Sequence, residues 1–430
     1  MSGSALGAAA AVLLLTSSGA LAGNGNGNGN GNPQDLDDST VNPTTQKFGH
    51  AQEPNVGDRT VDFWTGQMTA ANGQTYTFKM VGGDPAAGGA DTVKVDIVAI
   101  DLSVAGLTFR GSDAVDPVMG SPLFQNSDYA NANAASTPRR GMGPGGALSD
   151  GNTDAQLADA TMRAQFNAVG TDYHLLLDPS AVHKTVTIDV PESAGMLMRT
   201  ARGVVAALVD EAWMQSTVEG LTRSLHYLEP HHLTLFLTND VLLFARTSRG
   251  ISCCQFGAHG ITDVTAEGNG SDGRQALQTY VWSSWLTAGL FSPTTAWAMQ
   301  DIYGLSHEVV EWASDPFLTN VVPSWASPIA PQYGCSNLLE TGDPVAGWGF
   351  ALGANNVIDP ADPTYSPTRP HGWGDGSYHA SDEVLLPWFF GVSPNTISQP
   401  TQTPSANVGR YTFMGDLNRF PFFHQPATGC

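Results

Sequence analysis

One segment, residues 297–314, constrains the fold more than any other part of the chain. It reads WAMQDIYGLSHEVVEWAS, and its apolar residues recur at helical spacing around nearly the whole circumference. Thr294 or Thr295 is expected to cap the start of this helix, and Asp315 followed by Pro316 is expected to end it. Because a helix that is apolar on every side has to be buried, we expect the core to form around it.

His307, Glu308 and Glu311 interrupt the second half of this apolar helix. His307 and Glu311 are separated by one helical turn and point the same way, so both can reach one cation. Glu308 lies about 100° further round the helix. This is the order of a His-Glu-x-x-His zinc helix, in which the glutamate takes a proton from metal-bound water, with Glu311 replacing the second histidine. Buried carboxylates need a partner, so we expect a cation; the alternative is an exposed His307–Glu311 pair with Glu308 in solvent.

A third metal ligand is expected downstream, in QYGCSNLLETGDPV at residues 332–345. Glu340 ranks first, because it follows two leucines and can leave a short structured segment. Asp343, in ETGDP, more naturally serves a turn. One histidine with two carboxylates is a harder ligand set than two histidines with one carboxylate, so manganese or calcium is an alternative to zinc.

The segments SHEVVEWASDPF, at 306–317, and PQYGCSNLLETGDP, at 331–344, carry a family resemblance. They resemble a set of secreted proteins with a Ser-His-Glu-x-x-Glu helix that look like zincin-type metallopeptidases, and more distantly the plant Exordium, or phosphate-induced, family. The resemblance implies cleavage of a peptide or protein substrate by metal-activated water. It also draws attention to His259 in GAHG, as a group that polarises the substrate or binds beside the metal. A loop histidine without a role is the alternative reading of His259.

The start of the chain predicts export. The apolar run over residues 5–15 and the triplet Ala20-Leu21-Ala22 are typical of a signal peptide, residues 1–22. Gly-Asn repeats then open a disordered linker over residues 23–59. No other run approaches the roughly 18 apolar residues of a membrane-spanning helix. We therefore expect a secreted protein, extracellular or at the cell surface, with no membrane contact after signal cleavage.

The net charge limits the possible binding partners, and the cysteine content predicts disulfide bonds. Lys and Arg total 18 against 40 Asp and Glu, a formal charge of −22, which excludes nucleic acid as the main partner. The four cysteines are expected to form up to two disulfide bonds in an exported chain. A bond between the neighbours Cys253 and Cys254 would strain the intervening peptide, so we expect one or both of them to pair with Cys335 and Cys430.

The remaining patterns predict an α+β fold with a mixed sheet. Three alternating segments between residues 60 and 104 indicate a β-meander within a β-rich N-terminal part, residues 60–150. Residues 151–430 form the predicted α+β catalytic part, which holds the zincin-like helix and ends in a long loop-rich tail. Within it, helices are expected over 153–168 and 191–226. The expected strands are DYHLLLD at 172–178, HHLTLFLTNDVLLF at 231–244 and CCQFGAHGIT at 253–262.

Further histidines lie in the tail. His371 and His379 share the Gly-rich stretch PHGWGDGSYH with Asp375, and Asp382 follows shortly after it. A cation site in this stretch is the alternative reading. A surface loop is the expectation.

The leading functional hypothesis is a secreted metal-dependent hydrolase, most simply a peptidase. His307, Glu311 and Glu340 would hold the metal, and Glu308 would act as general base. The missing second histidine motivates a rival, a secreted or cell-surface binding protein that keeps the scaffold without turnover. A carbohydrate-directed enzyme that pairs Glu308 with another carboxylate is a third reading.

Overall fold

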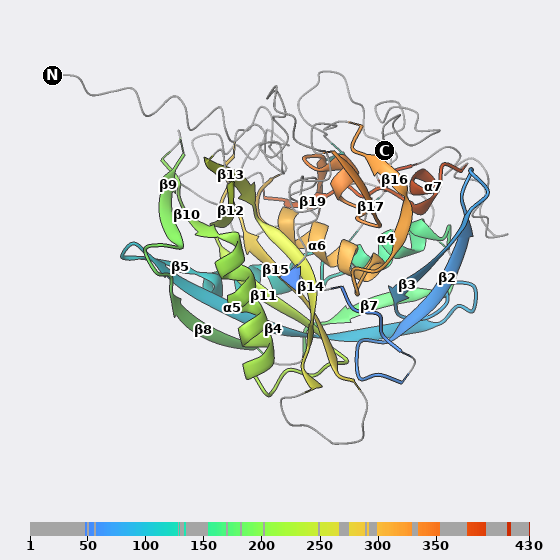
Figure 1. The fold of residues 1–430 in the computed structure, drawn as a ribbon, viewed down its shortest axis with the longest axis horizontal. Helices are drawn as coiled ribbons and strands as arrows, with labels where there is room; N and C mark the ends of the chain where they lie inside the picture. Colours follow the sequence, from blue (N-terminus) through green and yellow to red (C-terminus); the bar gives the residue numbers. More distant parts are fainter. Residues whose placement is uncertain are drawn as a thin grey trace.

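The computed structural model covers most of the chain after the expected linker (Figure 1). The predicted signal peptide and most of the linker lie outside the described residues, as do Thr294 and Thr295. The described residues are 48–49, 51–55, 57–127, 129, 133–134, 154–168, 171–180, 183–200, 203–247, 250–265, 275–288, 290–291, 299–328, 334–352, 376–392, 411–413 and 430.

A mixed eight-stranded sheet organises the fold (Figure 1). Its order is β1 (Phe48–Gly49), β14 (Gly257–Asp263), β15 (Leu277–Trp285), β11 (Leu233–Asn239), β4 (Ala90–Val104) and β5 (Leu107–Arg110), and both β7 (His174–Asp178) and β8 (His183–Asp189) pair with β4. β11 runs parallel to β15 and β4, whereas β14 runs antiparallel to β15. Strands from both sides of residue 150 therefore share one sheet.

Smaller sheets surround the central one. They are β2 (Phe63–Thr69) with β3 (Thr75–Val81); β13 (Gly250–Gln255), β12 (Val241–Thr247), β10 (Val205–Asp210) and β9 (Gly195–Arg199); β16 (Val321–Ala326) with β17 (Cys335–Leu338); and β19 (Tyr378–Ser381), β18 (Gly349–Leu352) and β6 (Asn133–Ala134). β2 and β3 form a hairpin, but β4 joins the central sheet, so the predicted meander is wrong beyond its first two strands. The mixed sheets and helices agree with the predicted α+β class.

Five α-helices lie within the described residues, and none of these has the length and apolar composition needed to cross a bilayer. They are α3 (Val115–Met119), α4 (Leu157–Gln165), α5 (Glu211–Ser224), α6 (Tyr303–Ser314) and α7 (Leu386–Phe389). The predicted helix over 191–226 is wrong in its first half, because β9 and β10 occupy it. The apolar run that forms β10 is too short for its periodicity to distinguish a helix from a strand. Its pairing with β9 and β12 makes it a strand.

Different helices cover the two faces of the central sheet. On one face, Leu305 and Val309 of α6 belong to the same buried cluster as Val281 of β15. On the other face, Met214 of α5 clusters with Trp282 of β15. All twelve residues of α6 are buried, as its apolar circumference predicts, although the helix begins at residue 303 rather than just after residue 293.

The cysteines pair differently from the expectation. Cys253 is bonded to Cys254, and Cys335 of β17 is bonded to Cys430. The Cα atoms of Cys335 and Cys430 are 5.6 Å apart, a usual disulfide separation. Because these two cysteines bond to each other, the adjacent pair has no other cysteine in the chain to bond with. The predicted pairing of the neighbours with distant cysteines is therefore wrong.

Replacing Cys430 with serine is expected to lower the free energy of unfolding by about 2–4 kcal/mol. The bond joins residues 95 positions apart, so its loss frees a long loop in the unfolded chain. Urea unfolding of Cys430→Ser, of Cys335→Ser and of the double variant measures the effect. The double variant should be no less stable than either single variant; additive losses would contradict this pairing.

Candidate metal centre

Six ionisable side chains converge where α6 meets β14 and the segment after β17. Each is at most 5 % exposed. α6 supplies three of them, β14 supplies one, and the segment after β17 supplies two. We call this set the His–carboxylate cluster; its members are His259, His307, Glu308, Glu311, Glu340 and Asp343. The structure thus brings together all six residues singled out from the sequence.

Three of these residues form what we call the His307 group: His307, Glu311 and Asp343. His307 Nε2 lies 3.4 Å from Glu311 Oε1 and 3.5 Å from Asp343 Oδ1. One donor atom from each residue lies within 4.8 Å of the other two, a separation that a single cation can bridge. Asp343 opens a short 3₁₀ turn, Asp343–Val345, and this turn places its carboxylate beside α6.

An overlapping set, which we call the His259 group, contains His259, Glu308 and Glu311. His259 Nδ1 lies 3.3 Å from Glu308 Oε2 and 3.9 Å from Glu311 Oε2. One donor atom from each of these three residues lies within 4.8 Å of the other two. Glu340, which ranked first as third ligand, lies near the other ring nitrogen of His259, with Oε2 3.7 Å from Nε2. Asp343, which ranked second, is the carboxylate beside His307.

Glu311 stands at the centre of the cluster. Its Oε1 accepts hydrogen bonds from the backbone N–H groups of Gly342 and Asp343, at 3.0 and 3.2 Å. Its Oε2 is buried and has no hydrogen-bond partner among the described residues. A Cβ atom at Gly342 would lie 2.3 Å from His307 Nδ1, so only glycine lets this backbone approach the helix so closely.

Burial and mutual repulsion govern the charges of these carboxyls. Burial, with Asp343 as the next cause, raises the pKa of Glu308 well above its usual value. Burial also raises the pKa of Glu311, and Asp343 and Glu340 add to that rise. The ion pairs that Glu308 and Glu311 form among the described residues are with histidines. A bound cation would favour the ionised carboxylates, so the donor set fits a metal ion.

Without a bound ion, stability is expected to fall as pH rises. Because the pKa values of Glu308 and Glu311 are raised in the folded state, the folded protein binds more protons than the unfolded chain. The stabilisation from this extra proton binding is complete below the usual glutamate pKa of 4.5. It is lost as the pH rises through the raised pKa values of the folded state. Each carboxyl contributes a slope of up to about 1.4 kcal/mol per pH unit.

Urea unfolding of the EDTA-treated protein at about pH 5 and pH 8 tests this expectation. The free energy of unfolding should be lower at the higher pH, and a saturating divalent cation should restore it there. Equal stability at both pH values would mean that folding does not raise the pKa values of these carboxyls.

Glu383 lies in the same electrostatic environment, although the sequence did not mark it as a residue of the site. It is buried, and burial raises its pKa well above the usual value, with smaller contributions from Asp382, Glu308 and Asp343. The apolar run VLLPWFF directly after it is the signal that could have marked it as buried.

His379 and Asp382 were expected in a surface loop, but both are buried. His379 lies in β19 and is buried, with Nδ1 2.7 Å from Asp301 Oδ2. Asp382 is also buried. Pairing of β19 with β18 draws this stretch into the core. His371 and Asp375 lie outside the described residues.

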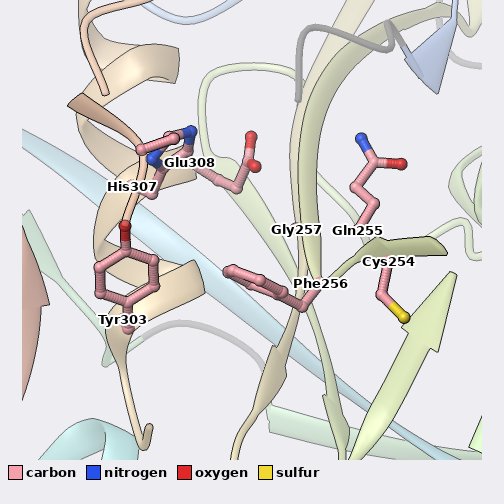
Figure 2. A pocket seen from close by; sticks show the side chains of 8 residues that line it. Cys254, Gln255, Phe256, Gly257, Tyr303, His307 and Glu308 are labelled. Atoms are coloured by element: carbon pink, nitrogen blue, oxygen red, sulfur yellow. The ribbon is translucent and has the colours of Figure 1, made fainter. Parts of the chain in front are cut away.

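A small pocket reaches the cluster between α6 and the end of β13 (Figure 2). Figure 2 shows the Glu308 carboxylate pointing from the helix toward the strand that holds Gly257. A Cβ atom at Gly257 would lie 2.8 Å from Glu308 Oε1, so a side chain there would press on the carboxylate. The lining residues are Cys254, Gln255, Phe256, Gly257, Tyr303, His307, Glu308 and Ala346. The cluster is therefore buried but adjoins a space that a water-sized group can enter.

Comparisons of the chain with protein-family models, with curated proteins and with solved structures give no match. The resemblance to zincin-type peptidases therefore stays a prediction from the residues. Function has to be inferred from the donor atoms, their burial and the adjoining pocket.

Proposed function

We propose that this protein is a metal-dependent hydrolase, most simply a peptidase, whose divalent cation is held by the His307 group. The observation that supports this most is that His307 and Glu308 line the pocket, whereas the other four residues of the cluster do not. A substrate in the pocket would meet a cation from one side only, as in hydrolytic metal sites that keep one position open. When bound, such an ion polarises the scissile carbonyl and lowers the pKa of a water molecule.

Within this proposal, Glu308 is the proton acceptor. Its Oε1 lies on the side of Gly257, which lines the pocket, and its Oε2 lies beside His259 Nδ1. A carboxylate held in this way accepts a proton from water in the pocket and returns it to the leaving amine. His259 orients the carboxylate, so we assign it a positioning role rather than a place among the metal ligands of the His307 group.

The third ligand in this proposal is Asp343 rather than Glu340. Asp343 Oδ1 lies 3.5 Å from His307 Nε2, whereas Glu340 lies nearest to His259 among these histidines. Zinc remains a candidate ion, and the two carboxylates beside one histidine keep manganese or calcium open.

A non-catalytic protein that holds a structural ion is the second candidate. Its support is the pair of hydrogen bonds from residues 342 and 343 to Glu311, which tie a distant segment to α6. An ion in the His307 group would strengthen that tie without any turnover.

Incubation of the metal-loaded full chain with a broad peptide library, followed by mass spectrometry, separates the two candidates. The hydrolase proposal expects new peptide termini that disappear when EDTA is added. A stoichiometrically loaded protein that cleaves nothing would favour the structural ion.

A further inference from the structure

The two donor groups of the cluster share a single residue, Glu311. Its Oε1 lies 3.4 Å from His307 Nε2, and its Oε2 lies 3.9 Å from His259 Nδ1. Each oxygen of the carboxylate therefore faces a different histidine. This is how a carboxylate bridges two cations, which in two-metal hydrolases are about 3.5–4 Å apart.

The surroundings of Glu311 Oε2 also favour a bound ligand. It is buried, faces the His259 group and has no hydrogen-bond partner among the described residues, whereas Oε1 accepts two backbone hydrogen bonds. A buried carboxylate oxygen without a hydrogen-bond donor is costly unless a cation approaches it.

The negative charge of the cluster also favours a second cation. It holds four buried carboxylates, those of Glu308, Glu311, Glu340 and Asp343, and Glu383 adds a fifth close by. One divalent cation offsets two negative charges. A second divalent cation would bring the five carboxylates close to balance.

We propose that the His259 group binds a second divalent cation, so that Glu311 bridges a two-ion centre. The ligand atoms are His259 Nδ1, Glu308 Oε2 and Glu311 Oε2. Glu308 Oε1, on the side of Gly257, stays available to accept a proton. This inference rests on the proposed function, because it adds an ion to the same pocket, and it extends that function to two-ion hydrolysis.

Glu340 acquires a role in this arrangement. Its Oε2 lies 3.7 Å from His259 Nε2, on the side of the ring away from Glu308 and Glu311. A carboxylate at this position attracts the ring proton to Nε2 and leaves the lone pair on Nδ1 for a metal. Because the remaining ligands are carboxylate oxygens, Mn²⁺ is a suitable probe for both positions.

The test uses the full chain, stripped of metal and then loaded with Mn²⁺. Elemental analysis gives the number of ions per chain, and electron paramagnetic resonance shows whether two Mn²⁺ ions are magnetically coupled. We expect two ions per chain and a coupled spectrum. The variant His259→Ala should keep one ion with an isolated-ion spectrum, and the exposed-site control His226→Ala should keep two coupled ions.

Each contrary outcome has a distinct meaning. One uncoupled ion in the wild type, lost in His307→Ala, would overturn the second ion and leave the proposed function standing. No bound ion at all would overturn both. A second ion that survives in His259→Ala lies elsewhere and also overturns this inference. If His259→Ala does not fold, the wild-type stoichiometry and spectrum still decide.

Discussion

Replacing Glu308 with glutamine is expected to lower the rate of hydrolysis roughly 10²–10⁴-fold, the usual contribution of a general base. Glutamine keeps the size of the side chain but cannot accept a proton. Glu308 belongs to the pocket wall rather than to the His307 group, so the ion held by that group should remain bound. The measurement is the initial rate of cleavage of a library peptide by Glu308→Gln and wild type, with the metal content of each.

Glu192→Gln is the matched control, because Glu192 is exposed and carries the same change of charge. It should cleave at the wild-type rate. Retention of turnover by Glu308→Gln would remove Glu308 from the mechanism. Loss of all bound ion in that variant would instead make Glu308 a required ligand rather than a base.

The substitution Glu311→Gln should act on metal binding and on stability in opposite directions. Glutamine can still accept the hydrogen bonds from Gly342 and Asp343 through its amide oxygen, but it offers only a weak ligand to a cation. We expect metal affinity to fall by about 100-fold or more, because an anionic ligand of both donor groups is lost. In the ion-free protein one buried, repelled carboxyl disappears, so the free energy of unfolding at pH 8 should rise by about 1–3 kcal/mol.

Isothermal titration with Mn²⁺ and urea unfolding of the EDTA-treated protein measure the two effects of Glu311→Gln. A variant that binds Mn²⁺ as tightly as wild type would place the ion away from α6. A less stable ion-free variant would show that Glu311 is fully compensated by partners in the absence of metal.

Helix α6 shows what the sequence can predict. Its burial, its end at Asp315 and the joint placement of His307 and Glu311 all follow from periodicity and from a proline after the last turn. These are local properties, and local spacing determines them. The apolar residues before Tyr303 continue the same spacing, so the sequence predicts a start soon after Pro293, several residues before the observed start at Tyr303.

The choice between Glu340 and Asp343 could not be made from the sequence. Both lie in one short segment, and only the path of that segment across α6 decides which carboxylate faces His307. Hydrogen bonds from residues 342 and 343 to Glu311 fix this path. They are long-range contacts without a signature in local spacing.

Non-local pairing also explains the larger errors. Val205–Asp210 is apolar enough for a helix, but pairing with strands on both sides makes it β10. His379 lies in a Gly-rich and polar region that suggests a surface loop, and the pairing of β19 with β18 buries it. In each case the partner segment is distant in sequence or was itself misassigned.

The most direct measurement is the metal content of the full chain, purified without chelators or affinity metal, beside that of His307→Ala. After reconstitution with zinc, manganese or calcium, the wild type should hold at least one ion per chain. His307→Ala should lose the ion of the His307 group, and the exposed-site variant His226→Ala should not. Wild-type protein that binds none of the three metals would contradict the account and leave α6 a purely structural helix.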